Sequence, residues 1–122
     1  MSEVRVTRKP LNPIDIEFAI LDVCDALETE TEQYAGLSEL AAETEAEYKL
    51  TYARAHVQLA SDYSIKMTVH ERQARADLAS NDALKVWKIA EARRMASKEG
   101  LLSLRARMDA LRTLSASLRN QT

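Results

Sequence analysis

The sequence contains only two prolines and two glycines in 122 residues, while alanine, leucine, glutamate and arginine dominate it. Proline and glycine interrupt helices most readily, whereas the four dominant residues favour them. A chain of this length is expected to form one domain. It has only one Trp, one Phe and four Tyr, so long helices would bury few large side chains within one chain. The composition therefore predicts an all-α fold, completed by self-association into an oligomeric helical bundle.

Capping signals mark where helices are expected to begin. Residues 1–11 form a basic tail that is expected to be flexible, and residues 12–122 form a single all-helical domain. Asn12 can cap a helix, and Pro13 at the first helical position loses no needed N–H. Thr68 followed three residues later by Glu71 matches a capping box. These two starts, separated by a turn at Ser61–Met67, predict a helical hairpin.

Two weak points are expected to interrupt the helices. Glycine readily adopts the left-handed conformation that ends a helix, so a break is predicted at Ala35-Gly36. The side chains of Ser80-Asn81-Asp82 compete for backbone hydrogen bonds, which predicts a stop and a restart. With these breaks, helices are expected at about 13–34, 38–60, 69–79 and 83–119, the last being a long amphipathic helix.

Apolar residues recur at three- and four-residue intervals in the first and last predicted helices. The first stripe comprises Ile14, Phe18, Leu21, Cys24 and Leu27, so the single cysteine is interpreted as a buried thiol. The last stripe has the spacing of a coiled-coil seam. Its residues are Leu101, Leu104, Met108, Leu111, Ser115 and Leu118. A seam at the chain end favours oligomerisation through its apolar members, and packing onto the first helix is the alternative.

Charge is segregated along the chain. Between Leu11 and Glu47 there are eleven acidic residues and no lysine or arginine, whereas from Tyr48 onward fourteen Lys/Arg stand against seven Asp/Glu. The total of -2 therefore hides an acidic and a basic region. Such a field selects partners. The basic region is expected either to attract a polyanion or to face acidic residues of its own fold or of a neighbouring subunit.

The residues needed for several kinds of chemistry are missing. Two glycines cannot form a phosphate-binding loop, and His56 and His70 lie on different predicted helices without a nearby cysteine, which disfavours a metal site. Glu43, Glu45 and Glu47 do not converge on one helical face. We therefore expect no enzyme activity, no catalytic residues, no metal and no cofactor. No apolar run is long enough for a membrane span and the start lacks a signal region, so a cytoplasmic protein without a membrane partner is expected.

Two groups of basic residues stand out. Lys98, Arg105, Arg112 and Arg119 recur every seven residues directly after a seam position. We interpret this stripe mainly as interhelical salt bridges beside the seam, with direct contact to DNA as the alternative. The second group surrounds the predicted turn and is interleaved with tyrosines, as in single-strand-binding surfaces. The candidate DNA-binding residues are Lys49, Arg54, Lys66, Arg72, Arg75, Lys85 and Lys88.

Three segments resemble the recombination mediators of tailed phages, whose prototype is the UvsY protein of T-even phages. They are Glu45–Lys49 with Tyr52–Arg54, Leu78–Val86, and the long C-terminal helix, and the similarity covers about Glu43 to Leu118. The resemblance implies a ring-forming helical protein that binds single-stranded DNA, displaces single-strand-binding protein and helps to load a RecA-type recombinase. Of the family's basic motif only Arg54 is matched, and its lysine companion is absent.

These observations lead to one hypothesis and two alternatives. The leading hypothesis is a non-catalytic, homo-oligomeric accessory protein that binds single-stranded DNA, because several weak basic surfaces in one assembly can follow one strand together. Its protein partners would be a recombinase and single-strand-binding protein. The first alternative is a structural or adaptor protein, such as a virion or assembly component, that self-assembles through coiled-coil helices. The second is a small inhibitor acting through its acidic first helix.

Overall fold

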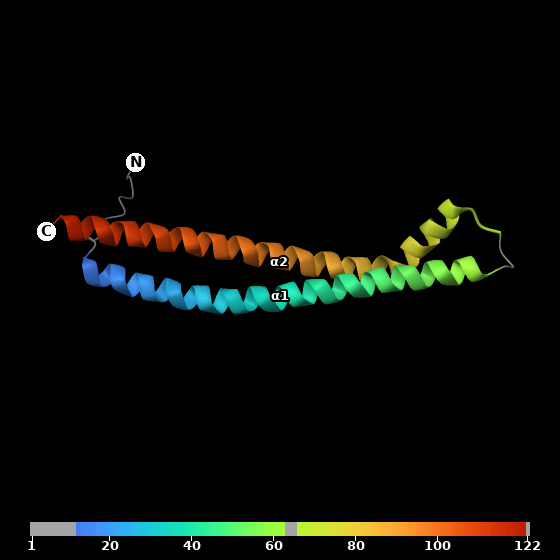
Figure 1. Ribbon diagram of the computed structural model, residues 1–122, viewed down its shortest axis with the longest axis horizontal. Helices are drawn as coiled ribbons and strands as arrows, with labels where there is room; N and C mark the ends of the chain where they lie inside the picture. The colour runs from blue at the N-terminus through green and yellow to red at the C-terminus, as the bar shows by residue number, and fades with distance from the viewer. Residues whose placement is uncertain (1–11, 63–65, 122) are drawn as a thin grey trace, which may run out of the picture.

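The computed structural model describes residues 12–62 and 66–121, which form an antiparallel hairpin of two helices. Helix α1 spans Pro13–Ser61 and helix α2 spans Val69–Asn120. The two helices lie side by side along almost their whole length, with the connection at one end of the molecule (Figure 1). Each is about 75 Å long at ~1.5 Å per residue. The predicted all-α hairpin is confirmed; the predicted tail at residues 1–11 lies outside the described residues.

Both predicted helix starts are confirmed. The Asn12 side-chain oxygen accepts a hydrogen bond from the Asp15 backbone N–H at 2.9 Å, and Pro13 is the first helical residue. At α2, the Thr68 hydroxyl accepts from the Glu71 N–H at 3.2 Å, and the Glu71 carboxylate accepts from the Thr68 N–H at 3.4 Å. These contacts satisfy N–H groups that have no partner inside a helix, so the hairpin connection lies where the local sequence predicts it.

The predicted break at Ala35-Gly36 is wrong, because α1 runs through it as one helix of 49 residues. Gly36 does not adopt a positive φ angle. Glycine in a helix interior costs about 1 kcal/mol relative to alanine, and packing on both sides outweighs that cost. Tyr34 and Leu37 are half-buried and Ala41 is buried against α2. Tertiary contacts therefore hold the helix through a residue that local propensity disfavours.

The predicted break at Ser80-Asn81-Asp82 is also wrong, since α2 is continuous over 52 residues. The Ser80 hydroxyl is buried and donates to the carbonyl of Ala76 at 2.7 Å. Its polar group is thus satisfied inside the helix rather than at a cap. Serines that bond back in this way often bend helices, and the first turns of α2 diverge from α1 (Figure 1). The sequence signal produces a bend here, not an end.

The core is a single seam between the helices with a seven-residue repeat. In α1, Ile16 and Val23 are buried seven residues apart, and in α2, Leu101 and Met108 are spaced in the same way. A seven-residue apolar repeat is typical of coiled coils. The other buried residues are all small: Ala41, Ala76, Ser80 and Ala90. The seam therefore has large aliphatic side chains toward the termini and small side chains toward the connection.

The predicted apolar stripe of the first helix is rotated from the buried one. Ile14, Phe18 and Leu21 are 59–63% exposed, and Cys24 is exposed as well, so the prediction of a buried thiol is wrong. Of that stripe only Leu27 is half-buried. The first turns contain two overlapping apolar stripes, and the buried one includes Ile16 and Val23, seven residues apart. A short window of sequence cannot distinguish them.

The C-terminal seam packs within one chain, which corrects the preferred prediction that it joins subunits. Leu101 and Met108 are 6% and 4% exposed in the single chain, facing α1. Leu104, Leu111 and Leu118 are half-buried on the same side of α2. Packing onto the first helix, the alternative interpretation, is the arrangement that the structure shows. Leu101 and Met108 are therefore covered by α1 rather than available to another subunit.

Candidate nucleic-acid interface

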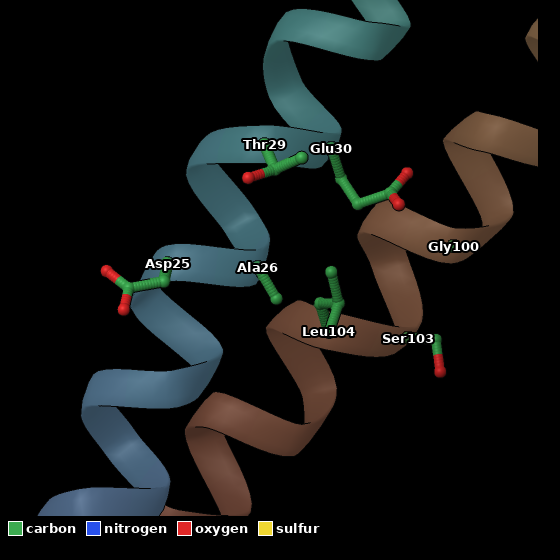
Figure 2. Close-up of a pocket in the computed structure, with 7 residues that line it drawn as sticks. All are labelled: Asp25, Ala26, Thr29, Glu30, Gly100, Ser103 and Leu104. Atoms are coloured by element: carbon green, nitrogen blue, oxygen red, sulfur yellow. The ribbon is translucent and has the colours of Figure 1, made fainter.

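The hairpin has two long flanks, one on each side of the seam. We letter the seven-residue repeat a to g so that seam residues are a and d, which makes Tyr48 and Trp87 a residues, and Val23 and Ala90 d residues. Because the helices are antiparallel, e positions of α1 lie beside e positions of α2, and g beside g. Ala26 and Gly100, both g residues, accordingly line one shallow groove (Figure 2). Each exposed side chain can thus be assigned to the e flank, the g flank or the outer side of the hairpin.

Aromatic side chains gather where the seam meets the e flank, in the half near the connection. The rings of Tyr48 and Trp87 stack across the two helices with centroids 5.5 Å apart and planes 18° from parallel. The ring centroids of Tyr52 and Tyr48 are 6.5 Å apart, and those of His56 and Tyr52 are 6.1 Å apart. All four residues are half-buried. Tyr48, Tyr52 and His56 form a row along α1, and Trp87 of α2 stacks on Tyr48 with its Nε1 buried and without a hydrogen-bond partner.

Basic side chains adjoin this aromatic row. The Lys88 ammonium lies 4.3 Å from the centre of the Trp87 ring, a cation–π distance. Lys49 is exposed and forms an ion pair of 2.8 Å with Glu45, one turn earlier on α1. Both lysines occupy b positions, the outer neighbours of the e flank. We call this surface the aromatic face; it comprises Tyr48, Lys49, Tyr52, His56, Trp87 and Lys88.

The structure separates the predicted DNA-binding residues rather than gathering them. Lys49 and Lys88 lie on the aromatic face. Arg54 and Arg72 are g residues on the opposite flank, and the Arg72 Nε is buried without a hydrogen-bond partner. The other three lie elsewhere: Lys66 before α2, Arg75 beside a pocket shared with Asp62 near the connection, and Lys85 on the outer side of α2. The sequence could not show this division, because it depends on the orientation of each helix.

Within the described ranges, three of the four basic e residues on α2 do not make their expected salt bridges with α1. Among residues 12–62 and 66–121, no ion pair joins Lys98, Arg105 or Arg112 to α1, and all three are exposed. The reason is the register of α1. The e positions of α1 opposite these three cations are Cys24, Thr31 and Ser38. Glu17, also an e residue, lines a pocket with Arg119, and most other acidic residues of α1 occupy the outer b, c and f positions. Three cations are thus left on the same flank as the aromatic row.

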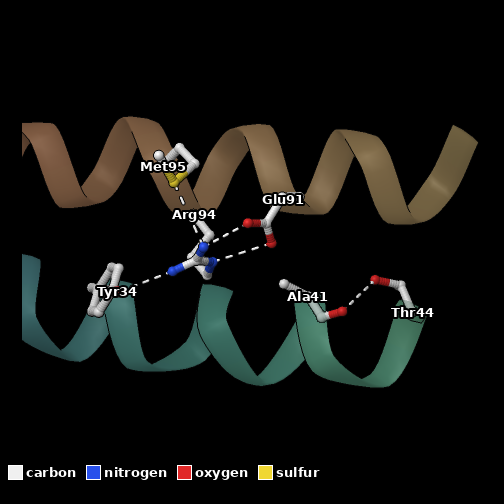
Figure 3. Close-up of polar contacts among 6 residues, drawn as sticks. All are labelled: Tyr34, Ala41, Thr44, Glu91, Arg94 and Met95. Carbon is white, nitrogen blue, oxygen red and sulfur yellow. Dashed lines mark hydrogen bonds and ion pairs between the residues drawn. The ribbon is translucent and has the colours of Figure 1, made fainter. Parts of the chain in front are cut away.

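One polar network inside the seam was not anticipated from the sequence. Arg94 occupies an a position, where its Nη1 donates to the Tyr34 hydroxyl at 3.2 Å and its Nε donates to Glu91 at 3.2 Å (Figure 3). The hydrogen bonds from Arg94 lower the pKa of both Glu91 and Tyr34, and they raise the pKa of Arg94 itself. An arginine in a coiled-coil seam specifies register at some cost in stability. Arg94, Leu101 and Met108 follow one another at intervals of seven residues. This spacing was the sequence signal that could have placed Arg94 in the seam.

Searches of the described residues and of known proteins add few functional constraints. In the described ranges, no three His, Cys, Asp or Glu side chains are grouped so that they could hold a metal ion. None of the described helices is long and apolar enough to cross a membrane. No family model matches the chain, and no curated protein or solved structure is significantly similar to it. The functional argument therefore rests on the geometry of the hairpin surface.

Proposed function

We propose that the protein is a non-catalytic accessory protein that binds single-stranded DNA along its aromatic face. The observation that carries this proposal is the partly exposed row of Tyr48, Tyr52, His56 and Trp87 with Lys88 beside it. Unpaired bases stack on aromatic side chains while cations contact the phosphates. Double-stranded DNA would offer such rings no base faces. The aromatic row therefore supports single-stranded rather than duplex binding.

The basic stripe extends this surface toward the termini. Lys98, Arg105 and Arg112 continue on the same flank, and their spacing of seven residues corresponds to about 10 Å per step. The e and b positions of α1 between residues 31 and 42, next to the aromatic row, are uncharged. They are Thr31, Ala35, Ser38 and Ala42. A strand leaving the aromatic row would thus follow cations past these uncharged residues, while Glu91 on the same flank pairs with Arg94 and the b residues Glu28 and Asp109 border the path farther on.

The proposal can be tested through the protein's own fluorescence. Trp87 is the only tryptophan in the chain, so bases that stack on the aromatic face should quench its emission. We expect oligothymidylate to quench Trp87 at ~50 mM salt and to dissociate as salt rises. The variant Lys98→Gln/Arg105→Gln/Arg112→Gln should bind more weakly, with a log–log salt slope reduced by about 2, since each phosphate contact on single strands contributes ~0.7.

A matched variant tests whether position matters rather than total charge. Arg75→Gln/Lys85→Gln/Arg107→Gln also removes three cations, but from positions outside the aromatic face. We expect this variant to keep most of the affinity and the Trp87 quenching. Equal loss in both triple variants would show that binding follows net charge alone. No quenching and no binding at ~50 mM salt would contradict the proposal itself.

The resemblance to phage recombination mediators suggests which process the proposed DNA binding would serve. Such a protein would hold single-stranded DNA in a form that a RecA-type recombinase can take over from single-strand-binding protein. The test is a strand-exchange reaction in which the DNA is first coated with single-strand-binding protein. We expect the protein to shorten the lag of recombinase loading, and the triple variant of the basic stripe to lose that effect.

A structural or adaptor role is the second candidate, and a separate observation favours it. Large apolar side chains remain exposed on both helices, among them Leu40, Val86 and Ile89. An exposed apolar surface on a slender hairpin favours assembly with another protein. If the protein assembles with no effect of DNA, the structural role is preferred. The third hypothesis, an inhibitor, would use the outward-pointing carboxylates of α1 and predicts binding to a basic protein partner.

A further inference from the structure

The g flank carries a surface that the hairpin itself leaves uncovered. Away from the terminal end of the hairpin, five large apolar residues at its g and c positions are between 40% and 66% exposed. They are Leu40, Leu50, Val57, Val86 and Ile89. We call this surface the apolar face. It lies on the side opposite the aromatic face and within the half of the hairpin whose seam is built from small residues. These apolar side chains are thus left exposed in the part of the hairpin where the seam buries the least apolar area.

The only two glycines of the chain lie on the same flank. Gly36 is a c residue of α1 and Gly100 is a g residue of α2. Neither has a positive φ angle, and a Cβ atom added at either would have no neighbour within 4 Å. Thus neither the backbone conformation nor the packing within the chain requires glycine, although each costs about 1 kcal/mol relative to alanine. Residues without side chains permit a close approach by another helix.

Two pairs of opposite charges on this flank lie at matching levels of the two helices. Tyr34 contacts Arg94 and Tyr48 contacts Trp87, which defines the residues of α1 and α2 that lie at the same level. By this register Glu43 lies within about one turn of the level of Arg93, and Arg54 within about one turn of the level of Asp82. All four side chains are exposed and make no ion pair among the described residues. They are available to a partner.

We propose that two copies of the chain pack face to face through the apolar face, about a twofold axis parallel to the hairpin. A rotation of 180° about this axis leaves each residue at the same height along the bundle. It places α1 of one copy against α2 of the other. Glu43 then faces Arg93 of the second copy, Arg54 faces Asp82, and Leu50 meets Val86. Gly36 lies close to Gly100 of the second copy. The acidic helix of each copy is laid on the basic helix of the other, in a four-helix bundle.

A second copy is the occupant that the observations favour. One surface supplies both an acidic helix and its basic complement at matching levels, as a self-complementary twofold contact requires. The aromatic faces of the two copies remain on the outside of the bundle. This inference does not rest on the proposed function: the chain can pair without binding DNA, and can bind DNA without pairing.

The test is a pair of charge variants with a mixing experiment, performed without nucleic acid. The acidic variant is Arg54→Glu/Arg93→Glu and the basic variant is Glu43→Lys/Asp82→Lys. Each alone should weaken the dimer by at least about tenfold, because like charges then face each other. Mixed in equal amounts, the two variants should form a heterodimer, since each pair of charged side chains across the interface then has opposite signs. Sedimentation velocity measures all three samples, and circular dichroism checks that the helices persist.

A charge-matched control changes residues on the outer side of the hairpin. Glu32→Lys/Glu39→Lys alters exposed f residues, adds the same positive charge as the basic variant, and should leave the dimer unchanged. A wild-type chain that sediments as a monomer would overturn the proposal. So would acidic and basic variants that each dimerise as well as the wild type, or that fail to associate when mixed although both remain helical.

The glycines provide an independent test of the same surface. Gly36→Leu/Gly100→Leu should preserve or increase helicity, because both sites are open within the chain and leucine favours helix more than glycine does. The same variant should lose the dimer, since four leucine side chains would hold the helices apart. A variant that dimerises like the wild type would place the interface elsewhere.

Discussion

The two halves of the hairpin differ in how they bury apolar surface. Toward the termini, the seam contains Ile16, Val23, Leu101 and Met108, each at most 6% exposed. Toward the connection, the fully buried residues are alanines and one serine, and the larger side chains at the seam are the half-buried Tyr48 and Trp87. Since hydrophobic stabilisation scales with buried apolar area, the terminal half holds the hairpin together more strongly.

This difference explains where surfaces for partners occur. The half near the connection leaves its large apolar residues outside, at Leu50, Val57, Val86 and Ile89. Its small seam residues let the helices approach, but they cannot supply much apolar burial. The same half holds the aromatic row. The terminal half thus contributes most of the buried aliphatic seam, and the half near the connection contributes the aromatic row and most of the apolar face.

The largest expected effect comes from truncating the terminal seam. Leu101→Ala should lower the free energy of unfolding by about 2–4 kcal/mol, through lost burial and the cavity that remains. Urea unfolding followed by circular dichroism, at one fixed protein concentration, measures the change. Leu102→Ala is the matched control, because Leu102 is 47% exposed. Equal losses in the two variants would contradict the assignment of Leu101 to the seam.

Enlarging the small seam tests the other half. Ala90→Leu should destabilise the hairpin by about 1–3 kcal/mol, because a buried site that is already filled must rearrange. The neighbouring Ala92 is exposed, so Ala92→Leu should have little effect. Thermal unfolding of both variants distinguishes the two sites. If Ala90→Leu were as stable as the wild type, the two helices would not be closely packed at this level.

The smallest expected effect on stability comes from the hydrogen-bond network of Arg94, Glu91 and Tyr34, which lies between the two halves. Arg94 lowers the pKa of Glu91 in the folded chain, so the carboxylate stabilises the fold above its ordinary pKa of 4.5. That contribution is lost as pH falls through the lower folded pKa. Glu91→Gln should therefore lose slightly less stability than the wild type on acidification from about pH 6 to about pH 3. Glu99→Gln is the control at an exposed site, and identical pH profiles for both variants would argue against the network.

Local signals predicted the ends of the helices better than their interiors. The caps at Asn12 and Thr68 act within a few residues, so the sequence nearby was sufficient to locate them. Gly36 and Ser80 are weak points of the same local kind, yet both helices continue through them. Packing along some fifty residues of antiparallel helix outweighs a local preference of about 1 kcal/mol.

Only part of the candidate site could be predicted from the sequence. Tyr48, Tyr52, Lys49 and Lys88 were identified as a basic and aromatic group, but Trp87 was not included, because its stacking on Tyr48 requires the register between the helices. Arg54 and Arg72 were placed with them and lie on the other flank. The expected salt bridges of Lys98, Arg105 and Arg112 depended on the same unknown register.

The sequence by itself determined that this chain is helical, where its two helices begin, and that its charges are divided between them. Those properties follow from propensity, capping and composition, which act locally. The tertiary structure alone decided that Leu101 and Met108 pack on α1 rather than on another subunit, and that Ile16 and Val23 are buried instead of Phe18 and Leu21. The physical reason is that burial depends on the register of two helices along their whole length, and no short segment contains that information.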